Sequence, residues 1–416
     1  MSSPVWHPFT QHGLGEEIPA IVRAEGATLH AADGRSFIDG ISSWWVTTHG
    51  HCHPRIMQAI AAQTQRMDQI IFAGLTHEPA EAVATALLRL LPGPLRHVFF
   101  SDSGSTSVEV ALKMALGYWL NTRRPRHRII VLEHGYHGDT IGGMSVGARG
   151  VFNRAYAPLL FDVETLPFPA PGREQATLAR LESLCASGDA AALILEPLIL
   201  GAGGMLIYAP ATLARMRAIC ARHGVLFIAD EVMTGWGRTG TLLACEQANI
   251  VPDIVCLSKG LTGGSVPLAV TVASPAIYEA HLSTDRAKMF FHSSSYTANP
   301  IACAAALANL QIWQEEPVLE RVAALAALQQ EMLESVRNLP SLFNLRRLGT
   351  ITAFELGSSN GDYLAADMPK FGAFFRERGV LLRPLGNTLY VMPPYCITRQ
   401  QLVQVYEAIA EAAELS

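Results

Sequence analysis

The sequence lacks the features that would place it in a membrane, outside the cell or on a nucleic acid. No uninterrupted apolar stretch reaches the roughly 18 residues that a membrane-spanning helix needs; the stretch 191–200 is interrupted by Glu196 and Pro197. The segment Met1–His7 has neither the charged nor the apolar region of a signal peptide. Basic runs of the nucleic-acid-binding type are missing too, and the net charge is −5. We therefore expect small molecules as partners, and neither a membrane nor a nucleic acid.

Paired-cysteine motifs are also missing. The seven cysteines are an odd number, are widely spaced and include no Cys-x-x-Cys pair. Reduced thiols in a cytoplasmic protein fit this pattern best. The chain has no internal repeat, and its 416 residues, 50% of them hydrophobic, are enough for one large buried core and a smaller companion.

Short apolar runs alternate with helical stretches in the middle of the chain, at 97–100, 128–132, 191–195, 225–229, 254–257 and 269–273. This alternation predicts an α/β fold, with a mostly parallel sheet covered by helices on both faces. Before it, Asp33-Gly34 predicts a hairpin and Pro54 the start of a helix that runs to Met67. We expect a large domain over 51–315 and a smaller α+β domain over 316–416, to which the segment 1–50 also belongs.

Two charged side chains follow apolar runs, where open α/β sheets bind ligands. Asp230 follows 225–229, and Lys259 comes just after 254–257. Asp230 alone could be a helix cap and Lys259 a surface residue. However, the apolar residues before Lys259 and the glycines after it indicate a partly buried lysine, which is a good Schiff-base former. Pyridoxal phosphate (PLP) requires such a lysine for its aldehyde and a carboxylate for its pyridine nitrogen.

A phosphate site is predicted where Ser101–Thr106 open a helix after Phe99-Phe100. Free backbone N–H groups and the positive end of the helix dipole favour an anion there. Any capped helix looks similar, but the combination with Asp230 and Lys259 is far more specific.

Tyr136, within His134–Asp139, is either an aromatic residue packed in a turn or a ring that stacks on the pyridine. The group His49, His51, Cys52 and His53 looks like a metal cluster, but a helix starts directly after it and no second ligand group is evident. We therefore expect no metal.

The run Phe227–Gly240, with Lys259 after it, resembles the class III (omega) aminotransferases of PLP fold type I, and the resemblance covers nearly the whole chain. Within that class, the sequence is similar to the biotin-pathway subfamily, which makes 7,8-diaminononanoate from 8-amino-7-oxononanoate with S-adenosylmethionine as amino donor. The segments that carry this similarity are Trp6–Thr10, Asp39–Trp45, Asp102–Ser105, His134–Thr140, Arg383-Pro384 and Met392–Tyr395.

The resemblance implies roles for individual residues. Lys259 would form the Schiff base and Asp230 would pair with the pyridine nitrogen, while Glu196 would be a charge partner behind them. The family is a homodimer whose neighbouring subunit completes each site. The remaining implied cofactor contacts are Gly104, Ser105, Tyr136 and, from the neighbour, Ser294 and Ser295, with Ser295 on the phosphate. The implied substrate contacts are Phe9, Trp44, Tyr136, Lys259, Ser293 and Arg383, with Arg383 on the carboxylate of the oxononanoate.

Two departures from the family pattern bear on the phosphate site and on the substrates. Ser293-Ser294-Ser295 stands where Gly-Pro-Thr is usual, and Ser295 keeps the hydroxyl. Phe9 stands where the subfamily usually has a tyrosine, so lysine stays open as donor, although Trp44-Trp45 favours S-adenosylmethionine. Three further functions also fit: a general omega-amino acid or amine:pyruvate aminotransferase, a class III isomerase with a single substrate, and a PLP-binding protein without catalysis. The intact Lys259 and Asp230 disfavour the last of these.

Overall fold

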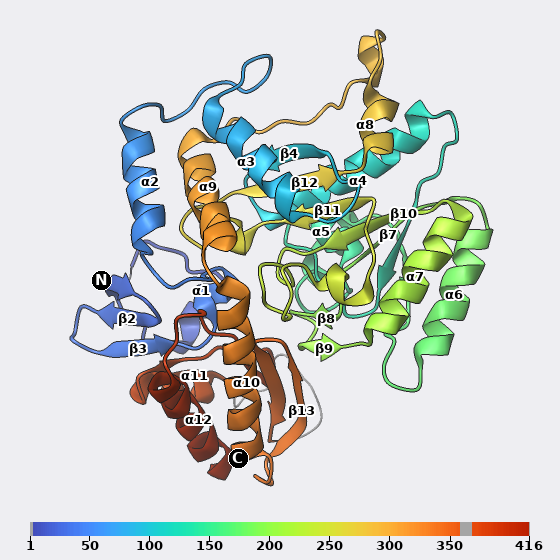
Figure 1. Ribbon diagram of the computed structural model, residues 1–416. Helices are drawn as coiled ribbons and strands as arrows, with labels where there is room; N and C mark the ends of the chain where they lie inside the picture. Colours follow the sequence, from blue (N-terminus) through green and yellow to red (C-terminus); the bar gives the residue numbers. More distant parts are fainter. Residues whose placement is uncertain (1–2, 358–367, 416) are drawn as a thin grey trace.

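The computed structural model describes residues 3–357 and 368–415. Its main body is a sheet with the strand order β4-β12-β11-β10-β7-β5-β6 (Figure 1). β12 is antiparallel to β11 and β4, and the other neighbouring pairs are parallel, so the predicted mostly parallel sheet is confirmed. The strands are β4 (His97–Ser101), β5 (Arg128–Leu132), β6 (Glu164–Leu166), β7 (Ala190–Leu195), β10 (Leu226–Asp230), β11 (Ile254–Leu257) and β12 (Ala269–Ala273).

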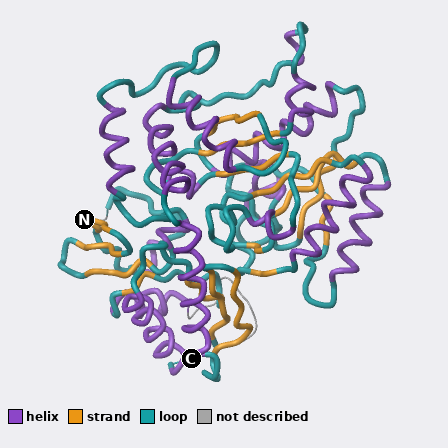
Figure 2. The backbone as a smooth tube through the Cα atoms, in the orientation of Figure 1, coloured by secondary structure: helices purple, strands orange, loops and turns teal. Residues whose placement is uncertain are grey.

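Helices cover both faces of this sheet, as Figure 2 shows. Side chains alternate along a strand, so Leu226 and Ile228 of β10 join one buried cluster while Phe227 and Ala229 join another. Each fully buried large apolar side chain contributes roughly 1.5–3 kcal/mol. The first cluster is closed by α4 (Gly104–Asn121) and α8 (Pro275–His281). The second is closed by α3 (Glu78–Leu90), α6 (Glu174–Ala186), α7 (Pro210–His223) and α9 (Pro300–Glu315).

Short elements fill the connections around the sheet. α2 (Pro54–Thr64) packs on α9 and begins at the predicted proline, and α5 (Ile141–Val146) follows β5. The others are the strands β8 (Ile199–Leu200) and β9 (Leu206–Ile207) and the 3-10 helices η1 (His12–Leu14), η2 (Arg154–Leu159), η3 (Ala244–Ala248), η4 (Lys259–Thr262) and η5 (Arg286–Lys288).

A second, smaller body holds the C-terminal elements. Its antiparallel sheet has the order β13-β14-β16, with β13 (Leu342–Leu348), β14 (Ile351–Leu356) and β16 (Thr388–Val391). The helices α10 (Val318–Val336), α11 (Met368–Glu377) and α12 (Arg399–Glu414) belong to the same body. Within residues 3–357 and 368–415, no helix combines the length and apolar character needed to cross a membrane.

The N-terminal strands join this smaller body. β1 (Ile21–Glu25), β2 (Thr28–Ala31) and β3 (Ser36–Asp39) form an antiparallel sheet, and β2 and β3 are the predicted hairpin. β3 also pairs in parallel with β15 (Val380–Leu381), far along the chain. In Figure 1 these strands lie beside α11 and α12.

Candidate active site

Lys259 lies where the chain leaves β11. It adopts a φ of 47°, which a non-glycine residue rarely accepts, and Gly260 follows so close to Trp236 that a Cβ there would lie 2.7 Å from that side chain. Nζ lies 4.8 Å from the centre of the Trp45 ring. Burial lowers the pKa of Lys259 to about 8, although the carboxylates of Asp230 and Glu196 act in the opposite direction. A lysine of this kind is partly deprotonated near neutral pH and can act as a nucleophile.

Asp230 is the last residue of β10 and is 4% exposed. One carboxylate oxygen accepts a hydrogen bond from the backbone N–H of Val232 (3.1 Å), and the other lies 2.7 Å from Nδ1 of His137. Burial lowers the pKa of His137, but the hydrogen bond and charge of Asp230 outweigh burial, so the pKa is raised overall. His137 and the N–H of Val232 therefore fix the orientation of the Asp230 carboxylate, which acts electrostatically on Lys259.

Tyr136 follows β5 and is held by Glu196, which follows β7. Glu196 accepts hydrogen bonds from the backbone N–H groups of Tyr136 (3.0 Å) and Gly201 (2.9 Å). Burial raises the pKa of Glu196 to about 7. Glu196 is therefore about half protonated at neutral pH, and its two hydrogen bonds fix the loop that presents the Tyr136 ring.

The start of α4 lies beside this loop. Ser103 caps the helix and accepts a hydrogen bond from the N–H of Thr106 (3.2 Å). The N–H groups of Gly104 and Ser105, at the very start of the helix, have no partner within the helix and point out of it. Ser105 Oγ accepts a hydrogen bond from the N–H of Asp139 (3.3 Å). A Cβ on Gly104 would lie 2.7 Å from Val232, so only glycine fits there without a shift. This is a helix N-terminus of the kind that binds phosphate.

A second group of predicted residues surrounds Arg383. Its guanidinium lies 4.8 Å from the centre of the Trp44 ring and 5.9 Å from that of Phe9, and it donates a hydrogen bond to the carbonyl of Phe9 (3.2 Å). The Phe9 ring also meets Trp44 edge-on, with centres 5.4 Å apart. An arginine stacked between aromatic rings keeps its donor edge available for a carboxylate.

Trp44 and Trp45 belong to one short turn, α1 (Ser42–Trp45). Trp45 faces Lys259 and Trp44 faces Arg383. Because the two residues are adjacent in the chain, this turn joins the two groups of site residues. A cleft of about 530 Å³ opens beside Tyr136 and Asp139 and reaches Phe152 and Thr388, so space for a ligand exists next to the site.

Comparison with known proteins identifies the family. The family model described as aminotransferase class-III matches residues 11–413. The chain belongs to the class III aminotransferases. The prediction from the Phe227–Gly240 run is thereby confirmed.

Two curated relatives of this class III aminotransferase carry one name, adenosylmethionine-8-amino-7-oxononanoate aminotransferase. The protein from Synechococcus elongatus is 47% identical, over 98% of this chain and 97% of its own length. The protein from Geobacter sulfurreducens is 38% identical, over 96% of this chain and 93% of its own length.

Two solved structures share the fold of this class III aminotransferase. The Methanocaldococcus jannaschii enzyme of that same name has a TM-score of 0.94 and 32% identity, covering 99% of this chain and 97% of its own. An amine transaminase from an uncultivated Pseudomonas species, in a PLP-bound form, has a TM-score of 0.92 and 32% identity, covering 99% of this chain and 98% of its own. The predicted fold, that of the PLP-dependent transaminases, is confirmed.

The predicted serine segment lies beside the loop that opens α4. Ser294 Oγ donates a hydrogen bond to Asp102, and the carbonyl of Ser295 accepts one from Gln69 (2.8 Å). The side chains of Ser293 and Ser295 are exposed. In this class III aminotransferase, the segment therefore presents two serine side chains outward.

Sequence reasoning missed His137 and Trp45 as site residues. His137 directly follows Tyr136 at the end of a strand, and this position was the available signal. The local pattern predicts only a turn there, whereas the structure buries His137 against Asp230. Trp45 gave no separate signal, because a buried tryptophan is most often a core residue.

Histidines near residue 50 have structural partners in this class III aminotransferase. His49 Nε2 lies 3.0 Å from Asn309 Oδ1, and His51 Nε2 lies 2.8 Å from Asp39. Among residues 3–357 and 368–415, no group of three or more potential ligands could hold a metal ion.

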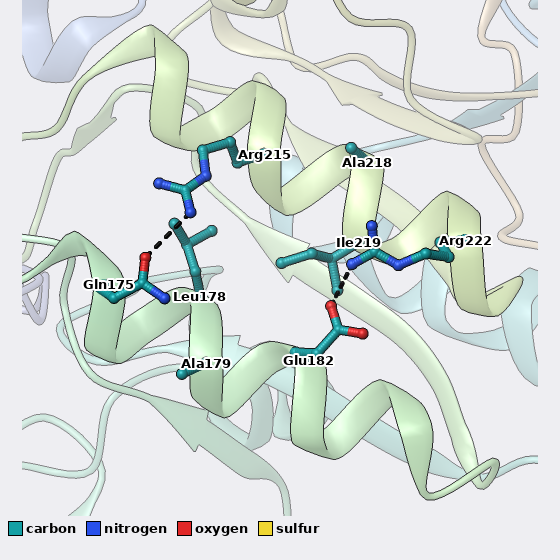
Figure 3. Close-up of a pocket in the computed structure, with 8 residues that line it drawn as sticks. All are labelled: Gln175, Leu178, Ala179, Glu182, Arg215, Ala218, Ile219 and Arg222. Carbon is teal, nitrogen blue, oxygen red and sulfur yellow. Dashed lines mark hydrogen bonds and ion pairs between the residues drawn. The ribbon is translucent and has the colours of Figure 1, made fainter.

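Figure 3 shows a separate groove between α6 and α7. An ion pair between Arg222 and Glu182 and a hydrogen bond from Arg215 to Gln175 (3.1 Å) cross it. None of the predicted site residues lines this groove, so we do not assign it to the reaction.

Proposed function

We propose that this class III aminotransferase catalyses the biotin-pathway step in which 8-amino-7-oxononanoate becomes 7,8-diaminononanoate, with S-adenosylmethionine as amino donor. The observation that carries the proposal is the guanidinium of Arg383 stacked on Trp44 and Phe9, at the far end of the turn that also touches Lys259. A substrate with a carboxylate at one end and a reacting carbonyl at the other suits such a site. The curated relatives of this name, at 47% and 38% identity, support the same reaction.

The residues around Lys259 fit pyridoxal 5'-phosphate as cofactor. The buried Asp230 provides the negative charge that a protonated pyridine nitrogen needs, and Lys259 provides an amine for the aldehyde. Tyr136 supplies a ring for stacking. Gly104 and Ser105 supply the phosphate-binding helix start, where the tight contact of Gly104 with Val232 permits no larger residue. When bound, the cofactor provides the electron sink that lets an amino group leave one carbon and join another.

Each residue has a separate task in the proposed mechanism. Lys259 Nζ would hold the cofactor, and its free amine would take the proton from the donor carbon and, in the second half of the reaction, give a proton to the carbon that receives the amino group. Asp230 would pair with the ring nitrogen, and His137 Nδ1 fixes its carboxylate. Arg383 holds the substrate carboxylate. Trp44 and Phe9, together with Ser293 of the partner subunit, line the space around the chain of the substrate.

The assembly that we propose is a homodimer with shared sites. Ser294 is engaged by Asp102 of its own chain, whereas the Ser295 side chain is exposed and free to reach the phosphate of a partner. Exposed apolar side chains near this segment, Phe291 at 63% and Tyr296 at 62%, support a surface that a second copy covers.

We also propose the domain division 1–50, 51–315 and 316–416. The pairing of β3 with β15 supports joining the first segment to the last. We further propose a cytoplasmic location, which the seven free cysteines support.

The amino donor is tested by mixing the loaded enzyme separately with S-adenosylmethionine, lysine and alanine. We expect S-adenosylmethionine to bleach the visible band of the cofactor, and 8-amino-7-oxononanoate then to restore it. Bleaching by lysine instead would move the donor assignment to lysine, in keeping with Phe9. If the oxononanoate does not restore the band, the biotin-pathway assignment is wrong. Restoration by pyruvate would then favour a general omega-aminotransferase.

The lowered pKa of Lys259 predicts how cofactor uptake depends on pH. With a pKa of about 8, Lys259 is mostly protonated below pH 8 and mostly a free amine above it, whereas an ordinary lysine changes at about 10.4. The rate at which the apoprotein incorporates PLP should therefore rise as pH increases and level off above about 8. Stopped-flow absorbance from pH 6 to 10 measures this rate. A rate that keeps rising to pH 10 would contradict the prediction.

A further inference from the structure

The turn that carries the paired tryptophans has a left-handed backbone conformation. Ser42, Ser43, Trp44 and Trp45 have φ values of 53°, 44°, 75° and 73°. L-residues avoid this left-handed region, and none of these residues is a glycine. Such a run persists only where its surroundings hold it, and it is common at functional sites. Some group must therefore hold this turn in place.

Asp39 is the group that binds inside the turn. It is the last residue of β3 and is fully buried, with 0% exposure. One carboxylate oxygen accepts hydrogen bonds from the N–H groups of Ile41 (3.2 Å) and Ser43 (2.9 Å). The other accepts one from Ser43 Oγ (2.8 Å) and lies 2.8 Å from His51 Nε2. All four hydrogen-bonding positions of the carboxylate are thus used. Two are taken by Ser43 of the turn, one by Ile41 directly before it and one by His51.

Other contacts fix the two ends of the turn. Ser42 Oγ donates to the carbonyl of Met392 (2.7 Å). At the other end, the buried guanidinium of Arg238 donates to the carbonyls of Trp45 (3.3 Å) and Thr47 (2.9 Å). Asp39 is the group that sets the conformation of Ser43 between these anchors, directly before the first indole.

The left-handed turn has a chemical result. It places two neighbouring indoles against two different cations, with Trp45 4.8 Å from Lys259 Nζ and Trp44 4.8 Å from the Arg383 guanidinium. Indole faces attract cations, most strongly where water is excluded. A right-handed turn would point the two rings in other directions, and at least one of the two cations would lose its contact with an indole face.

We propose that Asp39 is a positioning residue of the active site, which holds the left-handed turn and so fixes the spacing between Lys259 and Arg383. This inference rests on the proposed function for the roles of those two cations. It goes beyond that function because it assigns to Asp39 control over how substrates of a given length are matched to the site.

Asp39→Asn is the test variant, because it keeps the shape but removes the charge and turns one acceptor atom into a donor. Asp253→Asn is the matched control. Asp253 also accepts a backbone N–H, from Phe227 (2.8 Å), and pairs with Arg217, but it lies before β11, away from the turn. The first readout is the near-ultraviolet circular dichroism of the apoprotein, with a Trp44→Phe/Trp45→Phe variant showing which part of the spectrum the turn contributes.

We expect the near-ultraviolet spectrum of Asp39→Asn to lack the same signal that is missing from the Trp44→Phe/Trp45→Phe variant. The far-ultraviolet spectrum should be unchanged. In the loaded enzyme, the KM for 8-amino-7-oxononanoate should rise roughly tenfold, as for the loss of one hydrogen bond to a charged group. Asp253→Asn should keep the wild-type near-ultraviolet spectrum and the wild-type KM. Adding Ser43→Gly to Asp39→Asn should restore part of the signal and of the KM, because glycine adopts a φ of 44° without steric cost.

An Asp39→Asn spectrum equal to that of the wild type would overturn the proposal, and so would a loss that Ser43→Gly does not recover. The proposed function fails separately, if the wild-type enzyme does not use the oxononanoate. The dichroism of the apoprotein still decides the role of Asp39 in that case, because it involves no substrate.

Discussion

Replacement of Lys259 by alanine is expected to lower the rate of amino transfer on the order of 10⁴-fold, the upper range for a positioned acid–base group, and to remove the visible band of the bound cofactor. The reason is that Lys259 has two tasks in the proposed mechanism, holding the cofactor and moving the proton. Neighbouring residues cannot replace it, because Asp230 and Glu196 are held in place by their own hydrogen bonds. Single-turnover absorbance with S-adenosylmethionine, the proposed donor, measures both the rate and the visible band.

The control for this experiment is Lys288→Ala, which we expect to retain the wild-type rate. The chain has lysine only at 113, 259, 288 and 370, so the lysine that carries the cofactor can also be identified directly by chemical fixation. Borohydride treatment of the loaded enzyme should fix the cofactor on Lys259 alone, as seen by peptide mass spectrometry. Ordinary activity in Lys259→Ala, or a label on another lysine, would refute the assignment.

Asp230→Asn should lower kcat by roughly 10²–10³-fold, the usual effect of removing one preorganised electrostatic contact. The amide cannot supply the negative charge that keeps the pyridine nitrogen protonated. The variant should fold and bind cofactor, because the amide keeps the size of the side chain and one acceptor for the N–H of Val232. Steady-state kinetics, with cofactor content measured in parallel, give the result.

The neighbouring carboxylate provides a matched control. Glu231 is fully buried like Asp230, but it accepts hydrogen bonds from Thr234 and from the N–H groups of Ala244 (3.0 Å) and Cys245 (2.8 Å), away from the site. Glu231→Gln should lower the melting temperature and leave kcat within about threefold of wild type. Equal losses of kcat in both variants would mean that Asp230 supports the fold and has no specific part in the chemistry.

The sequence predicted the large sheet well because its strands are continuous apolar runs that end in polar residues. The predicted run 254–257 coincides with β11, and 225–229 differs from β10 by one residue. The short strands β1 and β6 were missed, since Ile21–Glu25 is largely exposed and Glu164–Leu166 has only three residues. Neither carries the pattern of a buried strand.

The parts of the site that the sequence did not reveal depend on distant contacts. His137 matters because it meets Asp230, 93 residues away. The turn at Ser42–Trp45 contradicts local preferences, since serine and tryptophan favour other φ values, and contacts from Asp39, Met392 and Arg238 impose it. Local patterns predict which residues carry chemistry, whereas they do not predict backbone conformations that tertiary contacts enforce.

The pairing of β3 with β15 has a consequence for the folding of the chain during its synthesis on the ribosome. Ile38 lies opposite Val380, so this pair of strands closes a loop that spans most of the chain. The large sheet is built from residues 97–273 and can form while synthesis continues. The end of the site around Trp44 and Arg383 has to wait until the C-terminal residues emerge. A nascent chain therefore acquires the lysine proposed to hold the cofactor well before it has the residues proposed to recognise the substrate.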